Sequence, residues 1–208
     1  MGTGPNRAGS SRKAIMSEID HSLKRLQLDY VDVYILHRWD WDTPIEETME
    51  AMNDVVKAGK ARYIGASAMF AWQFEKAYMT AKMHGWANFI TMQNHLNLLY
   101  REDEREMLWA CDDAGVVCTP YSPNASGYCC HPWGSKHNRS ENDFKTAEKY
   151  AATKALDEPI VNRIEEVANK RGIPMVQVPL AWVRSKNPVF APIVGVTEPW
   201  HLDDAVAS

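Results

Sequence analysis

The sequence predicts a parallel α/β fold, and three patterns indicate it. Short β-branched and aromatic segments alternate with segments of helical periodicity. The starts of the predicted strands lie about 30 residues apart, and most of the predicted helices are followed by glycine. Strand and helix in alternation are typical of a parallel sheet covered by helices. The predicted strands are Tyr30–Leu36, Arg62–Gly65, Phe89–Met92, Val116–Thr119 and Phe190–Val194.

The predicted helices follow from apolar residues that recur on one helical face. In the first helix, one face carries Ile15, Ile19, Leu23 and Leu26. Ser10 or Ser11 is suited to cap this helix. Thr43 and Glu46 have the spacing of a capping box, with Pro44 as the first helical residue. The predicted helices are Ser11–Leu26, one from Thr43 to Gly59, Ala71–His84, Glu102–Ala114, Pro159–Lys170, Pro174–Arg184 and Pro199–Ala207.

Residues 124–156 break this alternation. They are rich in Ser, Asn, Gly, His and Lys and have little periodicity. We interpret them as a long loop over one face of a single domain that spans residues 1–208. Loops of this length often bind ligands or close over a site.

Two architectures are built from such units, a doubly wound sheet and a (β/α)8 barrel. A doubly wound nucleotide-binding sheet carries Gly-x-Gly-x-x-Gly directly after its first strand. Gly2, Gly4 and Gly9 do not match, because no strand precedes them and the third glycine comes too late. A barrel needs eight strands and roughly 250 residues. We therefore predict an incomplete (β/α)8 barrel of the TIM type, with about five strands present.

Composition excludes several classes of partner. The chain has 208 residues and a formal net charge of -4, without a basic stripe, so we expect no nucleic-acid binding. No apolar stretch approaches membrane-spanning length, and four cysteines without a secretory signal indicate a cytoplasmic protein with reduced thiols. Cys129, Cys130, His131 and His137 lack the spacing of a zinc site, so no metal is predicted. The open sheet edges favour a homo-oligomer.

Polar residues follow each predicted strand, at the barrel face where chemistry collects. These strand ends carry motifs that resemble those of the aldo-keto reductases, in family order and spacing. The resemblance covers about Ser11 to Ala205 and is nearest to the aryl-alcohol-dehydrogenase-like and potassium-channel-β-subunit-like branch. The motifs are Ile35-Leu36-His37, Gly59 to Ser67, Met92-Gln93-Asn94, Tyr121-Ser122-Pro123 and Ile193 to Thr197.

The resemblance implies a nicotinamide cofactor and a set of roles for individual residues. His37 matches the active-site histidine, which helps to position and polarise the substrate carbonyl. Ser67 and Gln93 match residues that hold the nicotinamide carboxamide, whereas Ala68 stands where the family commonly has asparagine. Tyr121 matches the aromatic residue that stacks on the nicotinamide ring. The segment that follows the pyrophosphate contains Ser122, Ala125 and Gly127.

A second matching segment corresponds to the family's adenosine site and contains Gly195, Thr197, Glu198, His201 and Asp204. The family often has a basic residue there for the 2′-phosphate of NADPH. Glu198 is acidic, and a carboxylate near the ribose suits a free 2′-hydroxyl. The family resemblance implies NADPH as the cofactor, and Glu198 makes NADH the alternative.

The same resemblance places the family's catalytic tyrosine, lysine and aspartate on strands that we do not find in these 208 residues. A fragment of a normal enzyme, a subunit completed by another chain and a non-catalytic relative all fit that pattern. The leading hypothesis is an NAD(P)-dependent oxidoreductase acting on an aldehyde, ketone or alcohol, with Trp39 in the substrate pocket. The alternative is a non-catalytic cofactor-binding or regulatory subunit.

Overall fold

The computed structural model describes residues 8–135 and 144–208, and the chain divides into two compact units. Unit 1 comprises Met1–Asn94 and Trp109–Val117. Unit 2 comprises His95–Leu108 and Cys118–Ser208. Gly2 and Gly4, together with His137 in the predicted loop, lie outside the described residues.

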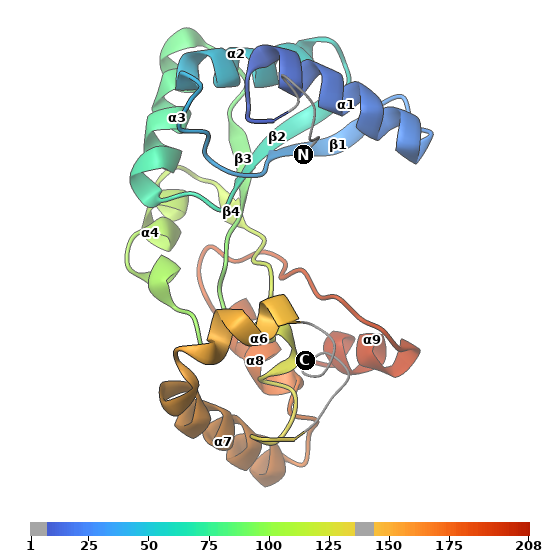
Figure 1. The fold of residues 1–208 in the computed structure, drawn as a ribbon, viewed down its shortest axis with the longest axis vertical. Coiled ribbons are helices and arrows are strands. Elements are labelled where there is room, and N and C mark those ends of the chain that lie inside the picture. Colours follow the sequence, from blue (N-terminus) through green and yellow to red (C-terminus); the bar gives the residue numbers. More distant parts are fainter. Residues whose placement is uncertain (1–7, 136–143) are drawn as a thin grey trace. The chain divides into compact units, whose positions relative to one another are not determined.

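Strands and helices alternate along unit 1, as the sequence predicts (Figure 1). The strand order in the sheet, β1-β2-β3-β4, follows the chain, and β1 with β2 and β2 with β3 pair in parallel. The predicted parallel α/β fold is therefore confirmed. Its elements are α1 (Arg12–Leu26), β1 (Val31–Leu36), α2 (Ile45–Lys57), β2 (Ala61–Ser67), α3 (Ala71–His84), β3 (Phe89–Gln93), α4 (Met107–Asp113) and β4 (Val117–Cys118).

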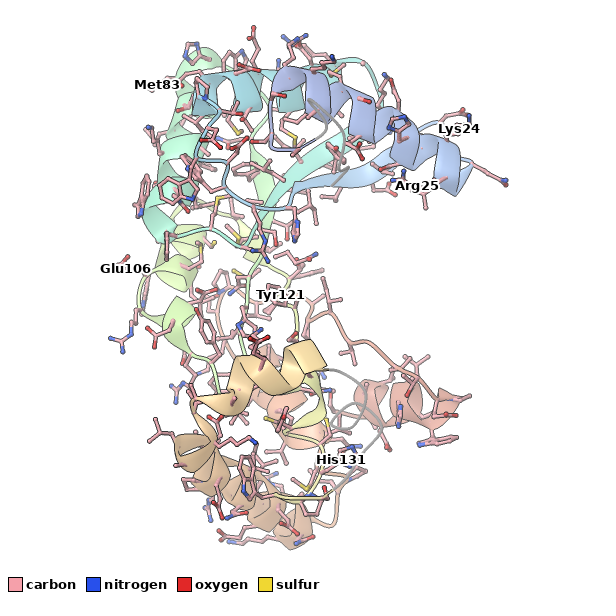
Figure 2. The ribbon with its side chains drawn as sticks, in the orientation of Figure 1. Lys24, Arg25, Met83, Glu106, Tyr121 and His131 are labelled. Atoms are coloured by element: carbon pink, nitrogen blue, oxygen red, sulfur yellow. The ribbon has the colours of Figure 1, made fainter. Side chains whose placement is uncertain are left out.

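Local capping explains where α1 begins and where α3 ends. The Ser11 hydroxyl accepts a hydrogen bond from the backbone N–H of Ala14, as expected of an N-cap. Gly85 ends α3 in the left-handed conformation that glycine adopts without strain. Lys24 and Arg25 project from the last turn of α1, where positive charge interacts favourably with the helix dipole (Figure 2).

The predicted capping box of α2 is wrong. Pro44 precedes the first helical residue, Ile45, and no side chain caps the helix. The Thr43 hydroxyl donates a hydrogen bond to Asp40 instead, at 2.7 Å. The Thr43 hydroxyl therefore bonds to this carboxylate and does not cap the helix.

The core of unit 1 lies between its strands and α1, α2 and α3, which lie on the same side of the strands (Figure 1). Apolar side chains at helical spacing fill this layer, as the sequence predicts, except for Leu26 at the end of α1, which is 56% exposed. Burial of each such side chain stabilises the fold by about 1.5–3 kcal/mol relative to full exposure. The largest fully buried ones in this unit include Ile19, Met49, Met52, Val55, Ile64, Phe74 and Met92.

Unit 2 consists mainly of helices packed around a smaller core. Ala125, Cys129, Tyr150 and Ile164 form the buried centre of that core. The elements of unit 2 are η1 (Glu102–Glu104), η2 (Ala125–Gly127), α6 (Phe144–Ala151), α7 (Lys154–Arg171), α8 (Gln177–Arg184) and α9 (Pro199–Val206).

Three predictions for these segments need correction. The single helix predicted over 102–114 is a 3-10 turn, η1, followed by the shorter α4. The predicted loop over 124–156 is wrong where it contains η2, α6 and the start of α7. The helix predicted to begin at Pro159 begins at Lys154, because the Thr153 backbone carbonyl accepts the N–H of Asp157 and opens the helix before the proline.

The predicted fifth strand, Phe190–Val194, does not form a continuous ladder in the described part of the chain. Isolated parallel bridges join Val189 to Cys118 and Ile193 to Tyr121. Pro192 lies between them, and proline has no N–H to donate to a ladder. The described residues therefore contain four strands, and the prediction of a fifth is wrong.

Candidate active site

Three predicted site residues lie at the carboxyl ends of adjacent strands in unit 1. Ser67 ends β2, Gln93 ends β3, and the two are register partners. The Ser67 hydroxyl donates a hydrogen bond to the Gln93 backbone carbonyl at 2.7 Å. His37 directly follows Leu36, the last residue of β1, whose register partner is Ala66. The parallel ladder therefore brings His37, Ser67 and Gln93 to one edge of the sheet.

Gly65 allows β2 and β3 to approach each other just before this edge. A Cβ atom at Gly65 would lie 2.7 Å from the Thr91 methyl carbon and 3.1 Å from the Thr91 backbone oxygen. Those distances are too short for an unchanged backbone. A side chain at this position would therefore push apart the strands that carry Ser67 and Gln93.

Ala68, directly after β2, has a φ of 44°, in the left-handed region. Non-glycine residues are uncommon there, and asparagine is several-fold enriched. The asparagine that the family commonly has at this position would suit the backbone, whereas alanine adopts it at a cost and offers no amide.

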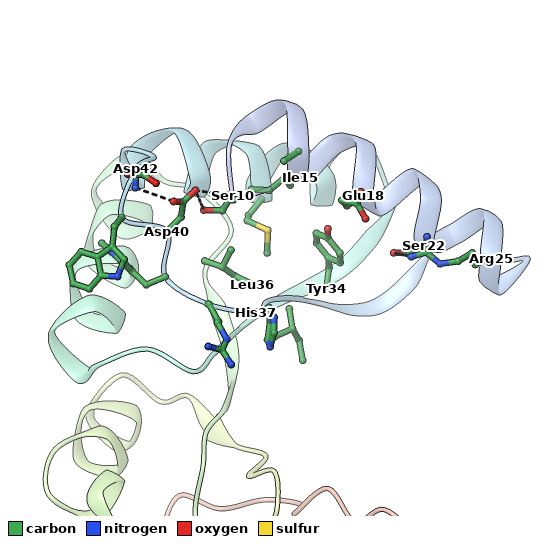
Figure 3. Close-up of a pocket in the computed structure, with 17 residues that line it drawn as sticks. Ser10, Ile15, Glu18, Ser22, Arg25, Tyr34, Leu36, His37, Asp40 and Asp42 are labelled. Carbon is green, nitrogen blue, oxygen red and sulfur yellow. Dashed lines mark hydrogen bonds between the residues drawn. The ribbon is translucent and has the colours of Figure 1, made fainter. Parts of the chain in front are cut away.

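A cavity of about 480 Å³ lies beside β1 in unit 1, and His37 and Trp39 line it (Figure 3). Tyr34 and Leu36 contribute an aromatic and an aliphatic wall. Burial raises the pKa of the Tyr34 phenol, with a smaller contribution from the nearby carboxylate of Glu18. The cavity therefore combines apolar walls with the imidazole of His37.

Asp40, which the sequence analysis did not select, organises the loop after β1. Its carboxylate accepts hydrogen bonds from the Ser10 backbone N–H at 2.7 Å and the Asp42 backbone N–H at 3.0 Å (Figure 3). It also accepts one from the Thr43 hydroxyl at 2.7 Å. Burial alone would raise the pKa of Asp40, but these bonds outweigh it and lower the pKa. Asp40 therefore anchors the loop that carries Trp39.

Trp39 belongs to a cluster of three indoles, two from the loop after β1 and one from the start of α3. Its ring centroid lies 6.5 Å from that of Trp41 and 5.7 Å from that of Trp72. Trp41 is 71% exposed and Trp72 is 52% exposed. The cluster therefore presents a broad aromatic surface next to the predicted substrate residue.

In unit 2, Tyr121 stacks on His95 with ring centroids 5.0 Å apart and an interplanar angle of 11°. Tyr121 is half-buried (Figure 2), whereas His95 is buried. A parallel backbone bridge also joins the two residues. The predicted nicotinamide-stacking ring is thus itself supported by a second flat ring. The sequence offered no decisive signal for this role, because a histidine after a strand usually makes a structural hydrogen bond.

The predicted pyrophosphate segment has an unusual backbone. Ser122, Ala125 and Ser126 have φ values of 53°, 48° and 57°, and Gly127 has a φ of 100°. Left-handed residues among right-handed ones turn successive N–H groups toward one side, a geometry that favours anions. Non-glycine residues in this region cost free energy and tend to cluster at functional sites. The N–H groups of Ala125 and Gly127, however, already donate to the backbone carbonyls of Ser122 and Asn124, so the phosphate contact stays a prediction.

The predicted adenosine residues surround the start of α9. Glu198 is the residue before the first helical turn, and Thr197 Oγ1 lies 3.4 Å from His201 Nδ1. Gly195 has no neighbouring atom within 4 Å of the position of a Cβ. Asp204 is half-buried on α9. These residues share one surface segment, mostly exposed, that a nucleotide can reach.

The predicted site residues thus form two groups. His37, Trp39, Ser67 and Gln93 lie in unit 1, and all the others lie in unit 2. Within each unit the residues gather on neighbouring segments. Their functional roles stay predictions.

The described residues contain no group of three or more His, Cys, Asp or Glu side chains that could hold a metal ion. Burial raises the pKa of Cys130 to about 12, and the pKa of buried Cys129 is raised as well. Both thiols therefore stay protonated at neutral pH, which disfavours metal binding by thiolate. No described helix is both long and apolar enough to span a membrane.

The sequence profile of the Aldo/keto reductase family matches residues 1–208. The chain belongs to the aldo-keto reductase family. Its parallel strands and covering helices are accordingly those of the family's (β/α)8 barrel, of which the described residues contain four strands.

Similar proteins of known sequence show the same affiliation. The chain is 47% identical over 205 residues to a versiconal hemiacetal acetate reductase of Aspergillus parasiticus, covering 98% of the chain and 59% of that protein. It is 39% identical over 201 residues to an aldo-keto reductase of Alternaria alternata, covering 97% and 54%. An aryl-alcohol dehydrogenase-like protein of Saccharomyces cerevisiae is 40% identical over 205 residues, covering 98% and 59%. The chain therefore spans less than two thirds of the length of these relatives.

Proposed function

We propose that this chain binds NADPH or NADH and takes part in hydride transfer between the nicotinamide and an aldehyde or ketone, or an alcohol in the reverse direction. The observation that carries the proposal is the pairing of Ser67 and Gln93 at adjacent strand ends, in a chain of this family. The Ser67 hydroxyl hydrogen is committed to the Gln93 carbonyl. The Gln93 side chain is half-buried and makes no hydrogen bond to another residue in the described ranges 8–135 and 144–208.

These residues fit a carboxamide ligand. The Gln93 amide can donate to and accept from a second amide, and the Ser67 oxygen keeps lone pairs that accept an amide N–H. Within unit 2, taken by itself, the half-buried ring of Tyr121 is of the kind that stacks on a flat heterocycle. When bound, a reduced nicotinamide supplies the hydride for the reaction.

His37 would act on the substrate. Exposed at the end of β1 and facing a cavity, its imidazole can donate a hydrogen bond to a carbonyl oxygen and favour the negative charge that develops there. Trp39 lines the same cavity and would bind the substrate through its ring. A small aldehyde or ketone is the substrate class that these groups suit.

Titration with each cofactor tests the proposal, because eight tryptophans provide an intrinsic fluorescence signal. We expect NADPH or NADH to quench the signal of the wild-type chain, and Gln93→Leu to weaken binding about 10-fold, the effect of losing a paired buried amide contact. Gln177→Leu, in α8 and outside the predicted site, is the matched control. Absence of quenching by both cofactors would contradict the proposal.

Turnover is followed in the same samples after an aromatic aldehyde is added. Consumption of the reduced cofactor supports the oxidoreductase function, and His37→Ala should lower the rate. Quenching without turnover would instead support a cofactor-binding subunit.

A further inference from the structure

His95 lies at the centre of a contact network in unit 2. The function proposed above gives a role to Tyr121 in this network but none to His95. Its ring stacks on Tyr121 as described, and also on Tyr100, with centroids 4.3 Å apart and an interplanar angle of 25°. Lys149 Nζ and Asn97 Nδ2 each lie 3.1 Å from His95 Nε2. The imidazole is thus held by two rings and by two polar side chains.

The orientation of Asn97 follows from its backbone contacts. Its Oδ1 accepts hydrogen bonds from the N–H groups of Leu99, at 2.9 Å, and Tyr100, at 2.8 Å. The carbonyl end of the amide is therefore identified, and the other end is the NH2 group, which donates. Asn97 is fully buried, so this orientation is not in competition with water.

Two donors therefore face the same ring nitrogen of His95. An ammonium group and an amide NH2 can only donate to Nε2, so Nε2 is an acceptor and the imidazole is neutral, with its hydrogen on Nδ1. Desolvation, and then the charge of Lys149, lower the pKa of His95 to about 4, which agrees with this neutral state. The ring is fixed in one tautomer and one plane.

The same network reaches the backbone beside Tyr121. Asn97 Nδ2 also donates to the Ser122 carbonyl at 3.0 Å, and Ser122 is one of the residues with positive φ. Lys149 Nζ lies 5.6 Å from the centroid of the Tyr121 ring. Side chain and backbone at 121–122 are thus held by the same three residues: His95, Asn97 and Lys149.

We propose that His95, oriented by Asn97 and Lys149, is a positioning residue that fixes the plane of the Tyr121 ring on which the nicotinamide stacks. This inference rests on the proposed function. A stacking platform improves affinity when its ring is already held in the bound orientation, because less side-chain freedom is lost on binding. The effect should therefore concern the nicotinamide end of the cofactor and leave the adenosine end unchanged.

The test compares each cofactor with its fragment that lacks nicotinamide, namely NADPH with 2′-phospho-ADP-ribose and NADH with ADP-ribose. In the wild-type chain the dinucleotide should bind more tightly than the fragment. His95→Leu should reduce that advantage about 2- to 10-fold, the value of a stacked aromatic pair. The affinity for the fragment should not change, whereas a merely structural defect would weaken both ligands.

Three further variants sharpen the test. His95→Phe keeps a flat ring and should retain most of the advantage, and Lys149→Met, which removes an exposed donor, should reduce it about 2-fold. The matched control is His84→Leu, since His84 also stacks on an aromatic ring, Trp86, at 4.3 Å and 14°, but in unit 1 and outside the predicted site. If His95→Leu does not fold, the difference between Lys149→Met and the His84→Leu control decides.

The outcomes separate the two proposals. A wild-type chain that binds neither dinucleotide overturns the proposed function and this inference with it. A wild-type chain that binds, together with His95 and Lys149 variants that keep the full nicotinamide advantage, overturns this inference alone. Equal loss of both ligands in His95→Leu also overturns it, because His95 would then support the fold without positioning Tyr121.

Discussion

The two units place their predicted site residues by different means. In unit 1, parallel ladders carry Ser67 and Gln93 to the sheet edge, and the strands rest on a layer of buried apolar side chains. In unit 2, single bridges replace the ladder at Tyr121, and the side chains of His95 and Asn97 hold the segment.

This difference indicates how each half responds to change. Ladder positions depend on the apolar layer, whose stabilisation is insensitive to pH and large per side chain. Positions held by buried polar side chains depend on the protonation state and on every partner being present, because an unpaired buried polar group costs about 1–3 kcal/mol. The stability of unit 1 should therefore depend most on substitutions that leave a cavity, and that of unit 2 on substitutions or pH changes that alter charge.

The largest effect is expected in the apolar layer of unit 1. Phe74 on α3 is fully buried, and Phe74→Ala should lower the free energy of unfolding by about 3–5 kcal/mol through lost burial and the cavity left behind. Urea unfolding measures the change. Met83→Ala on the same helix is the control, since Met83 is 73% exposed and should change stability by no more than about 0.5 kcal/mol. Similar losses for both variants would contradict the contrast between the units.

A pH effect should distinguish unit 2. The pKa of His95 is lowered from 6.5 to about 4 by desolvation and then by Lys149. As the pH falls from 6.5, the unfolded chain takes up a proton at this histidine before the folded chain does, so the free energy of unfolding decreases. The full loss is roughly 3 kcal/mol and is complete near the folded pKa. Urea unfolding between neutral pH and about pH 4 measures it.

Substitution of His95 isolates this contribution. His95→Phe cannot take up the proton and should reduce the pH dependence. The remainder comes from His131, whose pKa is also lowered by burial, and from the carboxylates of Asp40 and Glu104, whose pKa values are lowered by their hydrogen bonds. A wild-type stability that stays constant from pH 6.5 to 4 would show that His95 is not held neutral.

Asp40 is the exception in unit 1, because a carboxylate positions its loop much as side chains do in unit 2. Asp40→Ala removes the acceptor for Ser10, Thr43 and Asp42 and should cost about 1–2 kcal/mol. It should also increase proteolytic cleavage in the loop after β1. Asp42→Ala is the control, since only the backbone of Asp42 contacts Asp40. Unchanged stability of the Asp40 variant would mean that the ladder alone orders this loop.

The smallest expected effect is an increase in stability. Ala68 has a φ of 44°, which costs an L-residue about 1–2 kcal/mol, and glycine removes that cost while adding entropy to the unfolded chain. Ala68→Gly should therefore stabilise the protein by about 0.5–1 kcal/mol in urea unfolding. Ala71→Gly, in the first turn of α3, should have the opposite sign. A loss at Ala68 would contradict the strain inferred from its backbone.

Much of unit 1 was predictable because its signals are local. The bounds of α3 and the Ser11 cap follow from periodicity and from residues within one helical turn. The strand ends that carry Ser67 and Gln93 could also be predicted, since neighbouring parallel strands present their carboxyl ends at one edge. Thr43 was misassigned because its hydroxyl donates to the carboxylate of Asp40 and accepts no hydrogen bond from the N–H groups at the start of α2.

Unit 2 was less predictable because its contacts join distant segments. Lys149 lay in a stretch read as loop, and Asn97 in a segment without periodicity, yet both meet at His95. The segment Phe190–Val194 has the composition of a strand, but Pro192 removes the donor that a ladder needs. No spacing in the sequence indicates these contacts.

The sequence by itself determined the parallel α/β class, the order of the strands and the residues that follow them, because hydrophobic periodicity, glycine stops and family motifs act within one or two elements. Only the tertiary structure decided how Asp40 holds the loop after β1 and how His95, Asn97 and Lys149 hold Tyr121. A hydrogen bond or a stacked pair between residues some 30 to 50 positions apart depends on where the chain brings them together in space. That depends on the packing of whole elements.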